Sequence, residues 1–302
     1  MGGGPGEVGR GDRRRRVSAT ASRFECLGLG FSVDASDPIA REVVEHLYAP
    51  CRTEAEPTIR FALRTVDAEK VTHVVTVDDA VTQSTDRAHL ALAHLVWEIS
   101  QAVVAAATGP STALLHAASA SDASGRAVLL PAASGSGKST LVTALIERGL
   151  GYLTDDISAV DLSSGLIRPY PKPISTPVRL RRKFEHAATI PDAHLEWLGD
   201  EGFITAADVG AVIASPAAPR MIVSPRYTPN AGTELTELSR AAAVRLLIDQ
   251  SFGIGSLGNE ALTFVGALVA DCRCYSLVYS DLAEAAAVVI DALGTDPAAA
   301  SD

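Results

Sequence analysis

The residues best suited to chemistry form a glycine-rich segment near the middle of this 302-residue chain, PAASGSGKST at residues 131–140. Backbone N–H groups of such a segment can converge on phosphate oxygens where no side chain obstructs them, as at Gly135 and Gly137. Lys138 would supply positive charge to the β- and γ-phosphates, and Ser139 a hydroxyl to Mg²⁺. The segment therefore predicts a nucleotide site made of Ala132, Ala133, Ser134, Gly135, Ser136, Gly137, Lys138, Ser139 and Thr140.

One position departs from the usual phosphate-loop pattern. Ala132 stands six residues before Lys138, where such loops normally begin with glycine. Alanine is the smallest replacement and it precedes the turn that surrounds the phosphates, so we expect the loop to function. The alternative is a flexible connection that contains a lysine by chance. The apolar residues before the loop and the helix-forming residues after it argue against that alternative.

Two adjacent carboxylates follow the loop. Asp155 and Asp156 come 17 and 18 residues after Lys138, at the end of a predicted strand. This is the end of the strand at which α/β sheets place their chemistry. One carboxylate can hold Mg²⁺, directly or through water, and the other can orient an attacking hydroxyl and accept its proton. The alternative is that the pair only begins a turn before Ile157.

The surrounding pattern alternates strands and helices. The strand, glycine loop, helix and strand around Lys138 would place phosphates at a helix N-terminus. His116, in LLHAAS, stands just before a predicted loop, where a lone histidine is more often a core residue than a functional one. The predicted strands are 127–130, 152–154, 157–161, 166–170, 221–223 and 275–279, and the predicted helices are 139–148, 239–249, 260–270 and one that follows Asp281.

The N-terminal part has a different pattern. We expect a disordered tail over residues 1–22 and a small α+β domain over 23–109, with strands in 24–33 and 58–77, a helix at 38–47 and a long helix at 86–107. Gly109-Pro110 would end that helix and mark the boundary to a catalytic domain at 110–302. The alternative is that the long helix packs into the nucleotide domain as a lid or bridge.

Taken together, these residues resemble the catalytic core of HPr kinase/phosphorylase, and more closely the shorter HPr kinase-related serine kinases. The resemblance covers residues 113–293. It rests on His116, AASGSGKS at 132–139, ERG at 147–149, LTDD at 153–156, PYPKPIS at 169–175 and the closing strand YSLVYSDL.

This resemblance implies an α/β fold whose P-loop nucleotide domain is phosphoenolpyruvate carboxykinase-like, preceded by the small α+β domain. It implies phosphoryl transfer from ATP to a serine or threonine hydroxyl of a protein or peptide, by analogy a ribosomally made peptide precursor. Asp156 matches the proton acceptor, with Asp155 beside it. Lys138 matches the phosphate-binding lysine and His116 the active-site histidine. Ser139 matches a Mg²⁺ ligand, and Asp155 is the second residue expected at the metal.

Three departures argue against the reverse, phosphorylase reaction and against HPr itself as the acceptor. Ala132 replaces a glycine, Thr140 stands where HPr kinases usually have glutamate, and the downstream glycine-rich segment with its Mg²⁺-binding glutamate is missing. Two other functions stay open: a regulator that uses ATP as a conformational ligand, and an ATPase whose acceptor is water. The donor also stays open among ATP, ADP, GTP and pyrophosphate.

Composition limits the partners. A formal charge of -10 argues against a nucleic-acid binder, which needs a basic surface to replace counterions. The most apolar region, residues 90–107, is interrupted by His94, Glu98 and Gln101, so we expect no membrane span. The four cysteines form no disulfide framework, which favours a cytoplasmic setting. A homo-oligomer is compatible with the sequence.

Three other motifs are weaker. GIGSLG at residues 253–258 spells the dinucleotide fingerprint but follows a predicted helix, so we interpret it as a loop. Lys172 and Arg181-Arg182 would neutralise charge on the transferred phosphoryl group or bind an acidic peptide; the alternative is a solvated basic loop. Cys272 and Cys274 lack a second ligand pair at zinc-site spacing.

Overall fold

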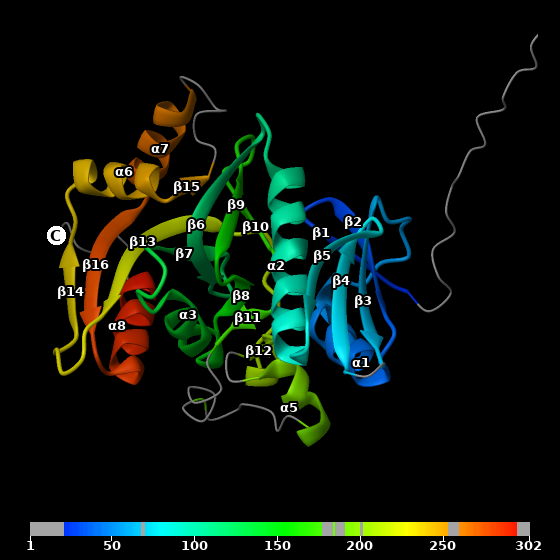
Figure 1. Cartoon of the computed structure of the whole chain (residues 1–302). Helices are drawn as coiled ribbons and strands as arrows, with labels where there is room; N and C mark the ends of the chain where they lie inside the picture. The colour runs from blue at the N-terminus through cyan, green and yellow to red at the C-terminus, as the bar shows by residue number, and fades with distance from the viewer. Residues whose placement is uncertain are drawn as a thin grey trace, which may run out of the picture.

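A computed structural model of the chain describes residues 21–67, 70–176, 184, 191–199, 202–252 and 260–294. The described chain is mixed α/β, with two main sheets on either side of a long helix, α2 (Ala88–Ala107) (Figure 1). Residues 1–20 of the predicted tail, the Arg181-Arg182 pair and the GIGSLG motif at 253–258 lie outside the described residues. A two-residue strand, β15 (Ser251–Phe252), follows the predicted helix before that motif.

The first sheet has five strands, and its order in space follows the order in sequence. All neighbours are antiparallel except β2 and β3, which are parallel and joined through helix α1 (Pro38–Leu47). Asp37 begins α1, as its side chain accepts a hydrogen bond from the Ala40 N–H, and the prediction of a helix at 38–47 is confirmed. The strands are β1 (Ser22–Cys26), β2 (Leu29–Ala35), β3 (Ile59–Val66), β4 (Thr72–Val77) and β5 (Ala80–Thr85).

The second sheet is larger and mixed. Its strands lie in the order β10-β9-β6-β7-β13-β16-β14, and both β8 and β15 also pair with β6. Strands β7, β13 and β16 are parallel, whereas β6 is antiparallel to each of its neighbours. The strands are β6 (Thr112–Ser121), β7 (Arg126–Pro131), β8 (Gly151–Thr154), β9 (Ile157–Asp161), β10 (Ile167–Arg168), β13 (Ala218–Tyr227), β14 (Glu234–Glu237) and β16 (Arg273–Tyr279).

Helices cover both faces of the second sheet. Alternate residues of β7 point to opposite faces: Val128 and Leu130 pack with α3 (Lys138–Glu147) and α8 (Leu282–Gly294), while Ala127 and Leu129 pack with α6 (Arg240–Asp249) and α7 (Glu260–Asp271). These helices match the predicted ones to within one or two residues. The remaining short elements are η1 (Ala49–Cys51), β11 (Ile174–Ser175), α5 (Asp192–Leu198), β12 (Phe203–Ile204) and η2 (Ala207–Val209).

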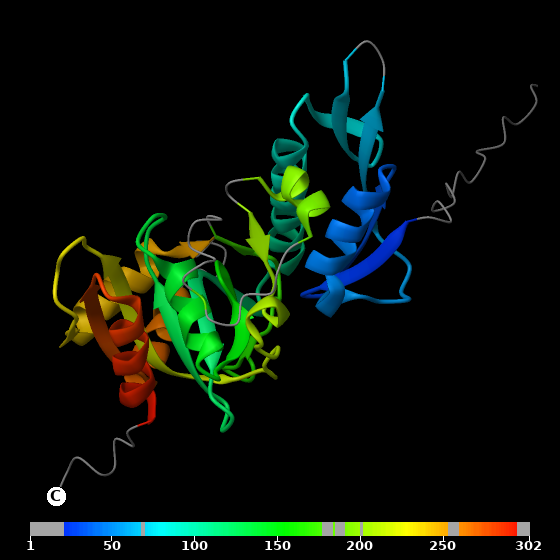
Figure 2. The ribbon, with the colours of Figure 1, turned by 90° about the horizontal axis from the view of Figure 1, so that it is seen from below.

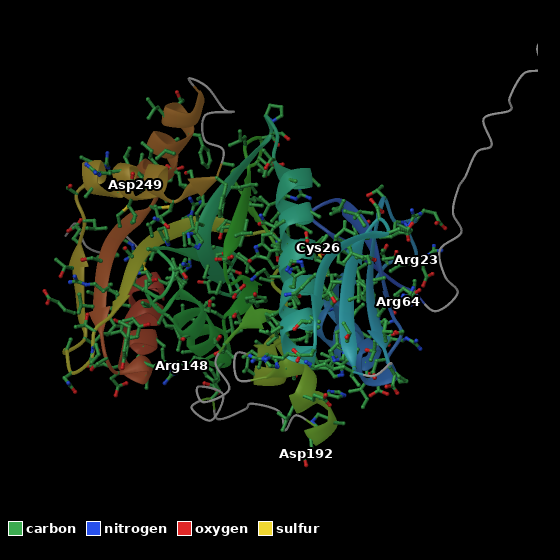
Figure 3. All side chains as sticks on the ribbon, in the orientation of Figure 1. Arg23, Cys26, Arg64, Arg148, Asp192 and Asp249 are labelled. Atoms are coloured by element: carbon green, nitrogen blue, oxygen red, sulfur yellow. The ribbon has the colours of Figure 1, made fainter. Side chains whose placement is uncertain are left out.

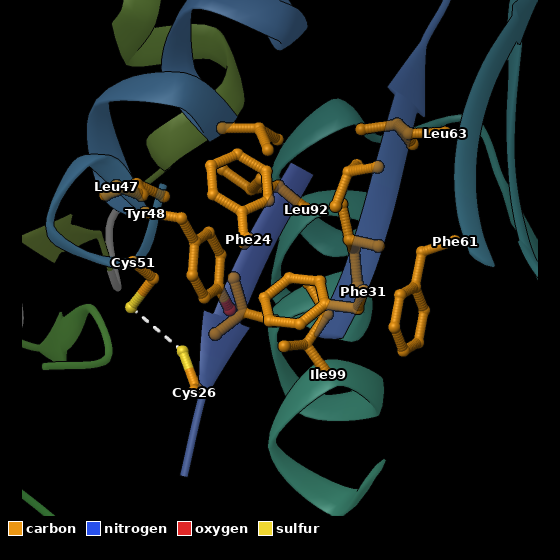
Figure 4. Packing of buried hydrophobic residues seen from close by; sticks show 14 of the residues in the cluster. Phe24, Cys26, Phe31, Leu47, Tyr48, Cys51, Phe61, Leu63, Leu92 and Ile99 are labelled. Carbon is orange, nitrogen blue, oxygen red and sulfur yellow. Dashed lines mark hydrogen bonds between the residues drawn. The ribbon is translucent and has the colours of Figure 1, made fainter. Parts of the chain in front are cut away.

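Helix α2 shares one continuous core with both sheets. Its buried residues include Leu92 and Ile99, which pack with Phe24 and Phe31 of the first sheet, as Figure 4 shows. The same core contains Tyr170 and other residues that follow or belong to the second sheet. Figure 2 shows α2 between the two sheets from a second direction, with α5 beside it. Among the described helices α2 alone is long and apolar enough to cross a membrane, by length and composition, and one of its faces is buried in the core shared with both sheets.

Many charged side chains are exposed, although Lys138, Asp155 and Lys172 are buried. Figure 3 shows Arg64, Arg148 and Asp192 at the surface, whereas Cys26 points inward. The Cys26 thiol lies 2.8 Å from that of Cys51, and all four cysteines are free (Figure 4).

One expectation about the second sheet is wrong. The loop predicted just after His116 is the second half of β6, a strand of ten residues from Thr112 to Ser121. Its alanines and serines have a low β propensity, so the local sequence did not indicate a strand. Central pairing in the sheet overrides that preference, because β6 has neighbours on both sides.

The shared core predicts that buried positions of α2 hold the fold together. Replacing the fully buried Ile99 with alanine should lower the free energy of unfolding by about 2–5 kcal/mol, since it leaves a cavity. Leu90→Ala, at a 39% exposed position of the same helix, should cost less than about 1 kcal/mol. Urea unfolding followed by circular dichroism measures both. Equal losses would contradict the proposed role of this core.

Candidate active site

The candidate residues meet where β6 changes partners on both sides. Strand β7 pairs with β6 only as far as Ala117, and the chain then leaves the sheet as the glycine-rich loop. On the other side, β8 pairs with β6 as far as Ser119, and pairing resumes with β9 at His116. The loop and the two aspartates therefore leave the sheet beside the same short part of β6.

The glycine-rich loop has a backbone that requires two of its glycines. Gly135 and Gly137 have φ values of 80° and 99°, in the left-handed region. A side chain at Gly137 would also overlap the hydroxyl of Tyr279, which donates a hydrogen bond to the Gly137 carbonyl at 3.3 Å. The Ser136 carbonyl accepts from the Tyr227 N–H at 3.0 Å. The loop is thus held by β13 and β16.

The remaining loop residues differ in burial. Ala132 is buried and does not have a positive φ, so its methyl group is accommodated without strain. Ala133 and Ser134 are exposed, and Thr140 is half-buried on the first turn of α3. The Ser136 hydroxyl is buried without a hydrogen-bond partner among the described residues. Such an atom is costly to bury unless a further group satisfies it.

Lys138, the first residue of α3, turns its ammonium back into the loop. Its Nζ donates to the carbonyls of Ala132 at 2.7 Å and Ala133 at 3.2 Å, and lies 3.3 Å from His116 Nε2. Burial lowers the pKa of Lys138, while the charges of Asp156 and Asp155 oppose this effect. The lysine is therefore a buried cation placed directly beside the aspartates.

His116 joins Lys138 to Asp156. His116 Nε2 lies 3.0 Å from Asp156 Oδ1, and Nδ1 lies 3.1 Å from Oε1 of Gln250. Burial alone would raise the pKa of Asp156, but the His116 hydrogen bond and the charges of Lys172, His116 and Lys138 lower it to about 2. Asp156 is therefore ionised at neutral pH.

Asp155 is almost fully buried and surrounded by donors. Lys172 Nζ lies 2.9 Å from Oδ1, and the Tyr152 hydroxyl reaches the same oxygen at 3.5 Å. The Ser139 hydroxyl and the Ser175 N–H each donate to Oδ2 at 3.3 Å. The two predicted metal ligands, Ser139 and Asp155, are therefore neighbours.

The two sides of this buried ion pair respond differently to burial. Burial raises the pKa of Asp155, and Lys172 opposes this. Burial would lower the pKa of Lys172, but the charges of Asp155 and Asp156 raise it. The 2.9 Å contact favours the charged form of both groups, against the effect of burial. The alternative that Lys172 lies in a solvated basic loop is wrong, because Lys172 is buried and pairs with Asp155.

The residues around Asp155 offer few ligands to a metal ion. In the described part of the chain no three His, Cys, Asp or Glu side chains are grouped to hold a metal. Mg²⁺ usually takes only one or two protein carboxylates and completes its shell with water and phosphate oxygens. The Ser139 hydroxyl and the Asp155 carboxylate fit that requirement.

Sequence reasoning missed three residues of the site. Gln250 orients His116, and Tyr152 contacts Asp155. The Tyr279 hydroxyl donates to the Gly137 carbonyl and occupies the space that a side chain at Gly137 would need. Each comes from a strand or helix end whose position in space follows from the sheet order. Local sequence carries no signal for the Gln250 and Tyr279 contacts, which join residues 134 and 142 positions apart in the chain.

No protein-family model matches this chain, and no curated protein is significantly similar to it. The chemistry of the site is therefore inferred from its own residues. The resemblance to HPr kinase-related serine kinases, carried by the short motifs quoted above, remains an expectation.

The Tyr279 contact predicts that replacing Gly137 lowers the free energy of unfolding more than replacing Gly135 does. Gly135→Ala should cost about 1–2 kcal/mol of unfolding free energy, because it places a side chain at positive φ in open space. Gly137→Ala should cost about 1–3 kcal/mol more, because the added methyl overlaps the Tyr279 hydroxyl. Combining it with Tyr279→Phe should remove most of that excess. Urea unfolding of the double-mutant cycle measures the coupling, and additive costs would show the contact to be unimportant.

The lowered pKa of Asp156 predicts a pH-dependent contribution to stability. Folding lowers the pKa of Asp156 from its ordinary value of 3.8 to about 2. The ionised carboxylate therefore stabilises the fold at pH values above the pKa of the unfolded chain. This stabilisation is lost as the pH falls through the pKa of the folded chain. The melting-temperature advantage of the native chain over Asp156→Asn should shrink as pH drops from about 6 to about 3. Asp192→Asn, at an exposed position, is the control. A melting-temperature difference that grows as the pH falls would contradict the stabilising role of the Asp156 charge.

Proposed function

We propose that this protein is an ATP- and Mg²⁺-dependent kinase that phosphorylates a serine or threonine hydroxyl of a protein or peptide. In this proposal the second sheet forms a phosphoenolpyruvate carboxykinase-like P-loop domain, and the protein acts in the cytoplasm. One observation carries the proposal: Lys138 Nζ and Asp156 Oδ1 lie 3.3 Å and 3.0 Å from the same atom, His116 Nε2. The proposed phosphate-binding cation and the proposed proton acceptor thus lie on either side of one histidine nitrogen.

The loop residues bind the donor in this scheme. The N–H groups around Gly135 and Gly137 and the unpartnered Ser136 hydroxyl would hold phosphate oxygens. Lys138 would exchange the carbonyls of Ala132 and Ala133 for the β- and γ-phosphates. Mg²⁺ held by Ser139 and Asp155 would supply further neutralisation of phosphate charge.

Asp156 is the proton acceptor. The acceptor hydroxyl oxygen bonds to the γ-phosphorus as the bond from that phosphorus to the β,γ-bridging oxygen breaks, and the hydroxyl proton passes to Asp156. The products are the phosphorylated hydroxyl and ADP. His116 orients the carboxylate at 3.0 Å, and Lys172 compensates the charge of Asp155 beside it. Such catalysis depends on positioning and electrostatics rather than on covalent chemistry.

The proposal predicts separate effects for the two central residues. Asp156→Asn keeps the size of the side chain but removes the proton acceptor, so phosphoryl transfer to a degenerate serine and threonine peptide library should fall about 100-fold or more. Lys138→Ala should lower transfer about 100–1,000-fold and weaken ATP binding as well. Incorporation of label from γ-³²P-ATP measures transfer, and Asp192→Asn should match the native chain.

The same assay separates the rival functions. Phosphate incorporated in proportion to ATP consumed supports a kinase. ATP consumed without incorporation identifies an ATPase, and ATP bound but not consumed identifies a nucleotide-responsive regulator. Undiminished transfer by Asp156→Asn would overturn the assignment of the base.

A further inference from the structure

A pocket opens beside Asp156 on the side that faces α2. Its volume is about 430 Å³, within the size range of small-ligand sites. The wall toward α2 includes Val96, Trp97 and Val104, and Phe252 of β15 also lines the pocket. Asp156 and Lys172 supply its charged groups. The pocket thus joins the proposed catalytic carboxylate to an apolar surface that belongs to another part of the chain.

Two aromatic rings of the apolar wall are exposed. Trp97 is 54% exposed and Phe252 40%, so large rings of two separate elements stand partly in water around one cavity. The Phe252 ring also contacts the ring of His116, at a centroid distance of 5.8 Å. Burying such rings against an apolar ligand is favourable by about 25 cal/mol per Å² of area removed from water. The wall therefore fits an apolar group beside the reacting atoms.

The pocket is wider than a hydroxyl-bearing residue alone needs. Successive residues of an extended segment advance by about 3.3 Å, so a neighbour of the phosphorylated residue would lie against α2 while the hydroxyl reaches Asp156. The exposed Gln101 carboxamide also lines the pocket. It can pair with a peptide N–H or C=O group. These features suit a peptide better than a single small alcohol.

We propose that the pocket selects an acceptor peptide in which a large apolar residue lies within two positions of the phosphorylated serine or threonine. Its apolar side chain packs on Trp97 and the adjoining wall of α2. The reaction at the hydroxyl rests on the proposed kinase function, whereas the binding of the apolar side chain does not. The N-terminal part of the chain thus takes part in substrate choice through α2.

Binding can be measured without catalysis, because Trp97 reports on the pocket. The chain has two tryptophans, and Trp197 is buried against His73. Blocked peptides containing Leu-Ser-Leu should change the fluorescence saturably, and matched Asp-Ser-Asp peptides should not. Trp97→Phe should lose the signal. No change in fluorescence, or an equal change with both peptides, would contradict the proposed binding of apolar side chains in the pocket.

Selectivity is measured with the same two peptides and labelled ATP. The native chain should prefer Leu-Ser-Leu by about tenfold or more in kcat/KM, and Trp97→Asp should abolish that preference. Leu90→Asp places the same charge at an exposed position of α2 outside the pocket lining and should keep it. Phosphorylation of both peptides at equal rates would contradict the proposed selection by the pocket but would agree with the proposed kinase function. Peptide binding that depends on Trp97, with no phosphorylation of any peptide, would contradict the proposed kinase function but would agree with the proposed apolar pocket.

Discussion

The buried charges around His116 depend on one another, and the rest of the site depends on them. Lys138, Lys172 and Asp155 are all buried, and an isolated charge at any of these positions would cost several kcal/mol. Lys172 and Asp155 form a 2.9 Å pair, while Lys138 and Asp156 meet through His116. These contacts require β6, the start of α3 and the end of β8 to come together at one place. The interrupted pairing along β6 supplies that place.

Helix α2 connects this polar centre to the first sheet. Its buried face completes the core formed by residues such as Phe24 and Phe31, and its partly exposed face carries Trp97 at the pocket beside Asp156. The same helix therefore both stabilises the N-terminal part and forms a wall next to the proposed reaction centre. A shift of the first sheet against the second would change the pocket before it changed the glycine-rich loop, which is held by β13 and β16.

Local sequence was enough for the parts of the site that follow one another in the chain. The loop, the helix that begins at Lys138 and the strand that ends before Asp155 were all predicted at their observed positions. The second half of β6 was missed, because alanine and serine carry little strand preference outside a sheet. The contacts of Gln250 and Tyr279, the Lys172 ion pair and the mixed strand order arise from pairing between distant segments. Periodicity within one segment cannot reveal them.

In the proposed reaction, the pocket bears on whether a hydroxyl or water would attack the phosphate. The Asp156 side chain is 41% exposed, so water has access to the proposed base. Nothing in the geometry of a carboxylate alone distinguishes water from an alcohol. An acceptor whose apolar neighbour fills the space between α2 and Phe252 would displace that water and hold its own hydroxyl in its place. Selection for transfer over hydrolysis would then come from the apolar wall rather than from the charged residues, which serve either reaction equally.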